Sequence, residues 1–144
     1  MGSNYLPDGV PPPHPTQDDF PFWDYCRQHE LRIQQCAACN TFRHPPRPVC
    51  GECGHFAWNW TRVSGRGTVF SYTIINHPVH PALKESLPYN VAVVLLDGVG
   101  DVRLVSNVID AAPEEMRIGL PVELVWQDLP EGMALARFRK SGVA

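Results

Sequence analysis

Residues 36–39 read Cys-Ala-Ala-Cys and residues 50–53 read Cys-Gly-Glu-Cys, so two C-x2-C pairs stand ten residues apart. Each pair places two thiolates on one tight turn, and two pairs together complete a tetrahedron around a metal ion. Four thiolates leave no coordination position open for water, which argues against a hydrolytic metal centre. The spacing predicts one structural zinc ion, bound in a small zinc ribbon over residues 31–56. The predicted ligands are Cys36, Cys39, Cys50 and Cys53.

Two alternatives to zinc remain open from the spacing alone. Iron in a rubredoxin-like redox site uses the same four thiolates. Four thiols without a metal are the second alternative. The remaining cysteine, Cys26, falls on the apolar face of a short predicted helix, where we expect a small buried hydrophobe. The sequence has no apolar run of about 18–20 residues and no visible signal peptide, so we expect a cytoplasmic protein with reduced thiols.

The N-terminal part divides into a tail and a helix. Residues 1–17 contain five prolines and few large apolar groups, which predicts a disordered, extended tail. Residues 18–30 predict a short amphipathic helix, because acidic residues at its start are followed by Phe22 and Trp23 on one face with Cys26. Phe22 and Trp23 either pack onto the body of the protein or dock onto a partner protein.

Beyond the second cysteine pair the sequence is rich in β-branched and aromatic residues. We expect residues 57–63 and 68–76 to form one long strand with a bulge at Gly65-Arg66-Gly67. Further strands are expected over residues 91–96, 102–109, 122–126 and 133–138, with a helical turn at 113–115. Five strands with a helix between the third and the fourth are the order of an OB-fold barrel, here residues 57–144. The expected fold class is therefore mainly β: an N-terminal helix, a four-cysteine ribbon and a five-stranded OB-fold barrel.

The charge of the chain is unevenly distributed. The net charge is -3, yet residues 27–66 carry six arginines against two glutamates, a balance of +4 before metal binding. An acidic chain is a poor general binder of nucleic acid, whose affinity rests on neutralising phosphates. An arginine-rich segment can still bind a small phosphorylated ligand. The four aromatic residues Trp58, Trp60, Phe70 and Tyr72 keep single-stranded nucleic-acid binding open as an alternative function.

Several motifs occur in an order that is typical of a known protein family. They are Phe22-Trp23, Leu31-x4-Cys36-x2-Cys39, Pro45-Pro46-Arg47-Pro48-x-Cys50-x2-Cys53, Ser64-Gly65-Arg66-Gly67-Thr68-Val69-Phe70-Ser71-Tyr72, Leu87-Pro88-Tyr89, Arg117-Ile118-Gly119-Leu120-Pro121-Val122 and Arg137-Phe138. Over residues 18–140 the sequence resembles the family of rubredoxin-like zinc ribbons joined to OB-folds that was catalogued as "domain of unknown function thirty-five". Members of that family accompany acyl-CoA enzymes.

The resemblance implies a function as an auxiliary subunit. Such proteins act with thiolase-superfamily enzymes, which include thiolases, condensing enzymes and lipid-transfer-protein-like aldolases that cleave steroid side chains. The family member binds the acyl-CoA or shapes the partner's site, and the partner supplies the nucleophile. In some relatives the domain is fused to a hydratase-like domain that this sequence lacks. We therefore expect no thiolase, aldolase or hydratase turnover from this polypeptide alone. The expected complex acts in lipid, steroid side-chain or aromatic acid metabolism.

The sequence also suggests which residues hold the ligand. Coenzyme A carries a 3′-phosphate and a diphosphate, and arginine forks suit such groups. Arg43, Arg47 and Arg66 are close in sequence to the ribbon and the expected bulge, and Phe42 can contact the adenine ring. Solvated surface arginines are the alternative. His77 and His80 lie on a probable loop without a nucleophile motif nearby, and we expect ordinary loop residues there.

Overall fold

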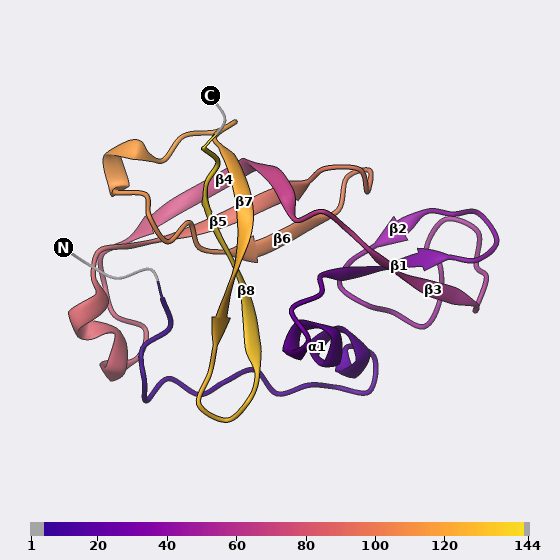
Figure 1. Cartoon of the computed structure of the whole chain (residues 1–144), viewed down its shortest axis with the longest axis horizontal. Coiled ribbons are helices and arrows are strands. Elements are labelled where there is room, and N and C mark those ends of the chain that lie inside the picture. Colours follow the sequence, from indigo (N-terminus) through magenta and orange to yellow (C-terminus); the bar gives the residue numbers. More distant parts are fainter. Residues whose placement is uncertain (1–4, 143–144) are drawn as a thin grey trace.

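The structure is a computed structural model that describes residues 5–142. One α-helix, α1 (Phe20–Arg27), precedes eight strands in two antiparallel sheets. A small three-stranded sheet projects from one side of a curled five-stranded sheet, and α1 lies beside their junction (Figure 1). The mainly β fold class predicted from the sequence, with a helix, a four-cysteine ribbon and a five-stranded barrel, is confirmed.

The ribbon sheet contains β1 (Arg32–Cys36), β2 (Phe42–Arg43) and β3 (Trp58–Arg62), in the order β2-β1-β3. The central strand, β1, pairs with β3 from Arg32 opposite Arg62 to Cys36 opposite Trp58. Its side chains Ile33 and Gln34 are both buried. The amide of Gln34 does not stay unpaired, because its Oε1 accepts a hydrogen bond of 2.8 Å from the backbone N–H of Arg47.

The barrel sheet has the strand order β6-β5-β4-β7-β8. Its strands are β4 (Arg66–Ile75), β5 (Tyr89–Leu96), β6 (Arg103–Ser106), β7 (Pro121–Asp128) and β8 (Ala134–Lys140). Two 3-10 turns interrupt the sequence of strands: η1 (Pro81–Ser86) before β5 and η2 (Pro113–Glu115) before β7. The sheet curls until its two edges meet, where Val108 bridges Phe138 in parallel.

The long strand expected across residues 57–76 does not form. β3 belongs to the ribbon sheet and β4 to the barrel sheet, so Gly65 turns the chain from one sheet to the other with a φ of 81°. A Cβ on Gly65 would lie 2.6 Å from the Cβ of Leu124, so glycine is required by space as well as by conformation. The bulge is present but lies later in β4, between Val69 and Ser71.

The helix α1 packs against β1 and β8 and so joins the ribbon to the barrel. Phe22 and Cys26 on its inner face are buried in the same core as Leu31, Ile33 and the barrel residue Phe138. The helix follows Asp19, whose carboxylate accepts hydrogen bonds from the backbone and hydroxyl of Thr16 and makes no bond to a helix N–H. Asp19 therefore stabilises the turn that precedes the helix and does not cap α1 with its side chain.

Residues 5–17, which we call the strap, run past the end of the β7–β8 hairpin toward α1 (Figure 1). Leu6 is held there by two hydrogen bonds with the side chain of Gln127, donated by the Leu6 N–H at 3.0 Å and by Gln127 Nε2 at 2.8 Å. Residues 1–4 of the expected tail lie outside the described residues. Disorder of residues 1–17 in solution stays a prediction.

None of the helices among residues 5–142 has the length and hydrophobicity to cross a membrane.

Candidate functional site

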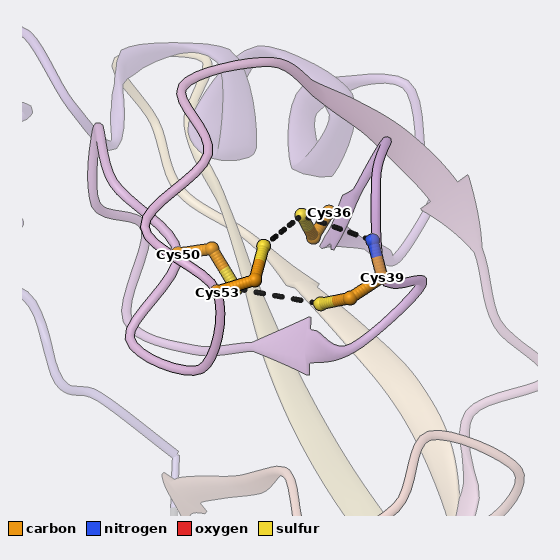
Figure 2. Close-up of side chains that lie close together, drawn as sticks. All are labelled: Cys36, Cys39, Cys50 and Cys53. Carbon is orange, nitrogen blue, oxygen red and sulfur yellow. Dashed lines mark hydrogen bonds between the residues drawn. The ribbon is translucent and has the colours of Figure 1, made fainter.

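The four predicted metal ligands converge in the ribbon. Cys36 ends β1, Cys39 lies in the turn to β2, and Cys50 and Cys53 lie in the loop between β2 and β3 (Figure 2). Their Sγ atoms all lie within 4.8 Å of one another. Cys36 and Cys53 are 3.6 Å apart between Sγ atoms, and so are Cys39 and Cys50. Four sulfurs at 2.3 Å from zinc would be separated by about 3.8 Å, so the cluster has the size of one zinc site.

The two turns that carry the thiols have the same backbone geometry. The N–H of Asn40 bonds the carbonyl of Cys36 at 3.0 Å, and the N–H of Gly54 bonds the carbonyl of Cys50 at 2.9 Å. Asn40 and Gly54 both adopt the left-handed conformation, with φ of 63° and 76°. Asparagine and glycine are the residues that tolerate this conformation best. The C-x2-C pairs are therefore closed by the residue that follows each of them.

Backbone amides point at sulfur in the first turn. The N–H groups of Cys39 and Ala38 lie 3.5 and 3.4 Å from the Sγ of Cys36, and they hold the pKa of that thiol below its ordinary value. Amide donors of this kind stabilise the thiolate form that a metal requires. With four thiolates and no position for water, the site suits a structural zinc ion.

A cavity of about 290 Å³ lies where the ribbon meets the barrel. Three of the four residues proposed to contact coenzyme A line it, namely Phe42, Arg43 and Arg47. Arg66, the fourth, is exposed at the start of β4 and does not line this cavity. The carboxylates of Glu52 and Asp101 also lie in the wall, which reduces the positive charge of the arginines.

Arg103 on β6 also lines the ribbon cavity, and sequence reasoning missed it. Its guanidinium lies 4.6 Å from the centre of the Phe70 ring, which orients it as a cation–π pair. Arg103 lies 60 residues after Arg43 in the sequence. Only the pairing of β6 with β5 brings it to the cavity, and no local motif marks it.

Arg43 differs from the other arginines because its side chain is buried, with 6% of its surface exposed. Its Nε and Nη2 donate hydrogen bonds to the carbonyl of Arg47 at 3.1 and 2.8 Å, and its guanidinium lies over the Trp58 ring. The third nitrogen, Nη1, is buried without a hydrogen-bond partner. A buried donor without an acceptor is costly, so this atom is a place where a ligand acceptor would stabilise the site.

The two residues proposed for partner binding lie in different environments. Phe22 is 6% exposed and belongs to the core, with its ring 5.2 Å from that of Trp23 and 5.1 Å from that of His44. Trp23 is only partly buried at the edge of that core. Phe20, which sequence reasoning did not single out, is half exposed. Of the two residues proposed for partner contact, only Trp23 therefore keeps appreciable exposed surface.

The environments of the remaining candidate residues explain them by packing or by local hydrogen bonds. Cys26 is fully buried, and burial raises the pKa of its thiol to about 12, which makes it unreactive. The Nδ1 of His80 accepts a hydrogen bond of 3.1 Å from the N–H of Ala82 and so caps η1. Of the aromatic residues considered for nucleic-acid stacking, Phe70 and Tyr72 are exposed, whereas Trp60 packs against the core.

Two family models match this chain and divide it between them. The model described as "ChsH2, rubredoxin-like zinc ribbon domain" matches residues 23–58, and the model described as "ChsH2, C-terminal OB-fold domain" matches residues 60–127. A solved structure titled "Ltp2-ChsH2(DUF35) aldolase" contains a chain that is 40% identical with a TM-score of 0.81, and the match covers 90% of this chain and 98% of that one. The chain belongs to the DUF35 family. The zinc assignment follows from this membership together with the four-cysteine cluster.

Curated DUF35 relatives include longer proteins. The "Probable enoyl-CoA hydratase alpha subunit" of Thermomonospora curvata is 42% identical over 135 residues, which is 92% of this chain. The "3-oxo-4,17-pregnadiene-20-carboxyl-CoA hydratase alpha subunit" of Mycobacterium tuberculosis is 35% identical over 125 residues, which is 87% of this chain. This chain spans 41% and 39% of the length of these two relatives.

Proposed function

We propose that this DUF35 protein is a non-catalytic subunit that binds an acyl-CoA thioester and completes a thiolase-type or lipid-transfer-protein-like aldolase. The observation that carries the proposal is the likeness to a chain of the Ltp2-ChsH2(DUF35) aldolase, which is matched over nearly its whole length. The names of the relatives place them in acyl-CoA and steroid metabolism, and we extend that setting to this chain. Because the chain spans about two fifths of the hydratase subunits, their hydratase activity is not carried over.

The chemistry of the described residues supports a role without catalysis. The metal centre has four thiolate ligands and no position for a substrate or a water molecule. The fifth cysteine is buried with a raised pKa. The bond-breaking step is therefore assigned to the partner enzyme, and this chain contributes binding and shape.

We place the nucleotide end of the thioester in the cavity between ribbon and barrel. Arg47 and Arg103 line it, and they complement the phosphates of coenzyme A in charge and in the geometry of their forks. Phe42 lines the same cavity and offers a ring for the adenine base. The orphaned Nη1 of Arg43 provides a donor for an acceptor group of the ligand.

The ligand assignment is tested by titration calorimetry on the chain in complex with its co-purified partner. Coenzyme A and 3′-dephospho-coenzyme A are compared for the wild type, Arg47→Ala and Arg103→Ala. We expect loss of the 3′-phosphate, or of one of these arginines, to weaken binding about tenfold or more. Arg62→Ala is the matched control, because Arg62 is exposed on β3 and does not line the cavity. Arg66→Ala tests whether the ligand extends along β4.

If coenzyme A and 3′-dephospho-coenzyme A bind the wild type and every variant with equal affinity, the coenzyme does not bind in this cavity. The subunit assignment is tested separately, by assaying thiolase or aldolase activity of the partner with and without this chain. We expect no turnover by this chain alone and full activity only in the complex. Turnover by the purified chain alone would contradict the non-catalytic role.

Partner contact through α1 is a further part of the proposal. Trp23 is partly buried and Phe20 is half exposed, so both rings keep surface that a partner protein can contact. Trp23→Ala is expected to weaken the complex at least tenfold in a co-elution or surface-binding titration. Phe56→Ala is the control, because Phe56 is also an exposed ring but lies on the far loop of the ribbon. Equal effects of the two substitutions would contradict a contact through α1.

A further inference from the structure

A second, larger cavity of about 660 Å³ lies beneath the strap. The strap forms one wall with residues 11–13, and the inner side of α1 and the loop after β2 form the next. Strands β6 and β8 provide the floor. This volume is within the range of cavities that hold small organic molecules. The cavity is distinct from the coenzyme cavity, although Arg103 and His44 line both of them.

The walls of the strap cavity are apolar and stiff. Three consecutive prolines, residues 11–13, face a wall that includes the ring of Trp23 and two more prolines, residues 45 and 46. Leu104 and Leu135 contribute aliphatic surface. Proline and tryptophan have few rotatable bonds, so a ligand would order few side chains on binding. Such a lining selects a rigid apolar skeleton, such as fused aromatic or alicyclic rings.

Arg137 on β8 adds a cation to this apolar lining. Its Nε donates a hydrogen bond of 3.1 Å to Gln127 Oε1, and its Nη1 donates to Asn107 Oδ1. Both acceptors are neutral amides, and no carboxylate within residues 5–142 lies at ion-pair distance from Arg137. Burial lowers the pKa of this guanidinium to about 10, with Tyr5 opposing the shift, so Arg137 stays protonated near pH 7.

The other ionisable groups in the wall leave the balance positive. Arg103 also lines the cavity, but its guanidinium is stacked on the ring of Phe70, which does not line it. The carboxylate of Asp19 is already bonded to the N–H and hydroxyl of Thr16. His44 is neutral near pH 7, because burial lowers its pKa to about 4. An anionic group therefore complements this cavity better than a neutral or cationic one.

We propose that the strap cavity binds a hydrophobic carboxylate, with a ring skeleton among the prolines and Trp23 and the carboxylate toward Arg137. The inference does not rest on the acyl-CoA proposal, because it uses a different cavity and a ligand without a nucleotide. Its apolar part requires the strap in place, since residues 11–13 form a wall of the cavity. A neutral apolar compound and a protein partner are the competing occupants.

The experiment uses 2-naphthoate as the probe and 2-naphthamide as its neutral counterpart, in titration calorimetry on the full chain near pH 7. We expect 2-naphthoate to bind at least tenfold more tightly than 2-naphthamide. Arg137→Gln should reduce that preference by about tenfold. Arg139→Gln is the matched control, because Arg139 lies two residues along β8, is exposed and pairs with Glu123 at 3.0 Å.

A third substitution tests the place of binding independently of charge. Val105 is 74% exposed and lines the cavity, so Val105→Trp narrows it with little effect on folding. We expect this substitution to weaken 2-naphthoate at least fivefold. If 2-naphthoate and 2-naphthamide bind equally well, the cavity recognises apolar surface without the carboxylate, and the proposal is overturned. Absence of binding at millimolar 2-naphthoate, or the same loss in Arg139→Gln as in Arg137→Gln, would also overturn it.

Discussion

The imidazole ring of His44 lies 5.1 Å from the phenyl ring of Phe22, at an interplanar angle of 49°. This contact places a titratable ring against the hydrophobic core, on the loop that connects β2 to the second cysteine pair. Burial lowers the pKa of His44 from 6.5 to about 4, and only the nearby Asp19 opposes the shift. The packing of α1 against the ribbon is thus coupled to the protonation state of one residue.

The stability of the chain should fall as the pH drops from about 6.5 to about 4. The unfolded chain takes up a proton on His44 near pH 6.5, whereas the folded chain does so only near pH 4. Protonation therefore favours unfolding throughout this window, by at most about 3 kcal/mol. Urea unfolding of the wild type and His44→Phe at several pH values measures the difference. A parallel pH dependence of the two proteins would exclude His44 as the cause, while a flatter curve for His44→Phe is expected.

Removal of one zinc ligand should abolish metal binding and unfold the ribbon. The ribbon sheet has three short strands and a small share of the core, so metal binding contributes much of its folding free energy. Elemental analysis should give one zinc per chain for the wild type and less than about a tenth of that for Cys36→Ser or Cys53→Ser. Cys26→Ala is the control, because Cys26 is a cysteine outside the cluster and this variant should keep its zinc.

Arg43→Ala and Arg47→Ala should separate stability from ligand affinity. Arg43 holds the carbonyl of Arg47 from a buried position, so its loss should lower the free energy of unfolding by about 2 kcal/mol or more. Arg47 has an exposed side chain, and its own carbonyl remains in the alanine variant, so its stability should change by less than about 0.5 kcal/mol. Denaturant unfolding of the two variants checks this contrast. Similar unfolding curves would contradict the structural role given to Arg43.

Gly67→Ala should destabilise the barrel. A Cβ at this position would overlap the backbone carbonyl oxygen of Leu95 on β5, which cannot move without breaking the pairing of β4 with β5. We expect a loss of about 1–3 kcal/mol in the free energy of unfolding. Gly142→Ala is the control, because nothing lies within 4 Å of a Cβ at that position. An unchanged unfolding midpoint for Gly67→Ala would contradict this prediction, because the pairing of β4 with β5 would then accommodate the added Cβ.

Phe22→Ala should mainly lower the stability of the chain, whereas Phe20→Ala should mainly weaken the complex with the partner. Phe22 lies in the core, so truncation should cost about 3–5 kcal/mol of stability. Phe20 is half exposed, so its truncation should leave stability nearly unchanged and weaken only the complex. Thermal unfolding and co-elution with the partner are measured for both variants. Deletion of residues 1–25 is a poor test of partner binding, since it removes Phe22 and uncovers Leu31 and Ile33.

The metal centre could be predicted from the sequence because all of its ligands lie within 18 residues and follow a local spacing rule. The barrel could be predicted from the order of its elements, since the helical turn at residues 113–115 separates the third and fourth barrel strands as expected. Both inferences rest on short-range patterns.

Features that depend on contacts between distant segments were not predictable in the same way. Residues 58–62 have the composition of a barrel strand, and only their pairing with β1 assigns them to the ribbon sheet. Arg103 and Arg137 lie on ordinary alternating strands, and their meeting with the strap and the ribbon loop is a result of barrel closure. The buried state of Arg43 also depends on its distant neighbour Trp58.

Cys50 belongs at once to the metal centre and to the wall of the ribbon cavity, together with Gly51 and Glu52. If a molecule on this wall changes how firmly the metal is retained, the metal changes the affinity of that molecule by the same factor. In that case zinc is a heterotropic effector of the cavity. Chelators should then extract the ion more slowly when coenzyme A is present. The exchange rate of the metal becomes a reporter of occupancy at a cavity that carries no chromophore of its own.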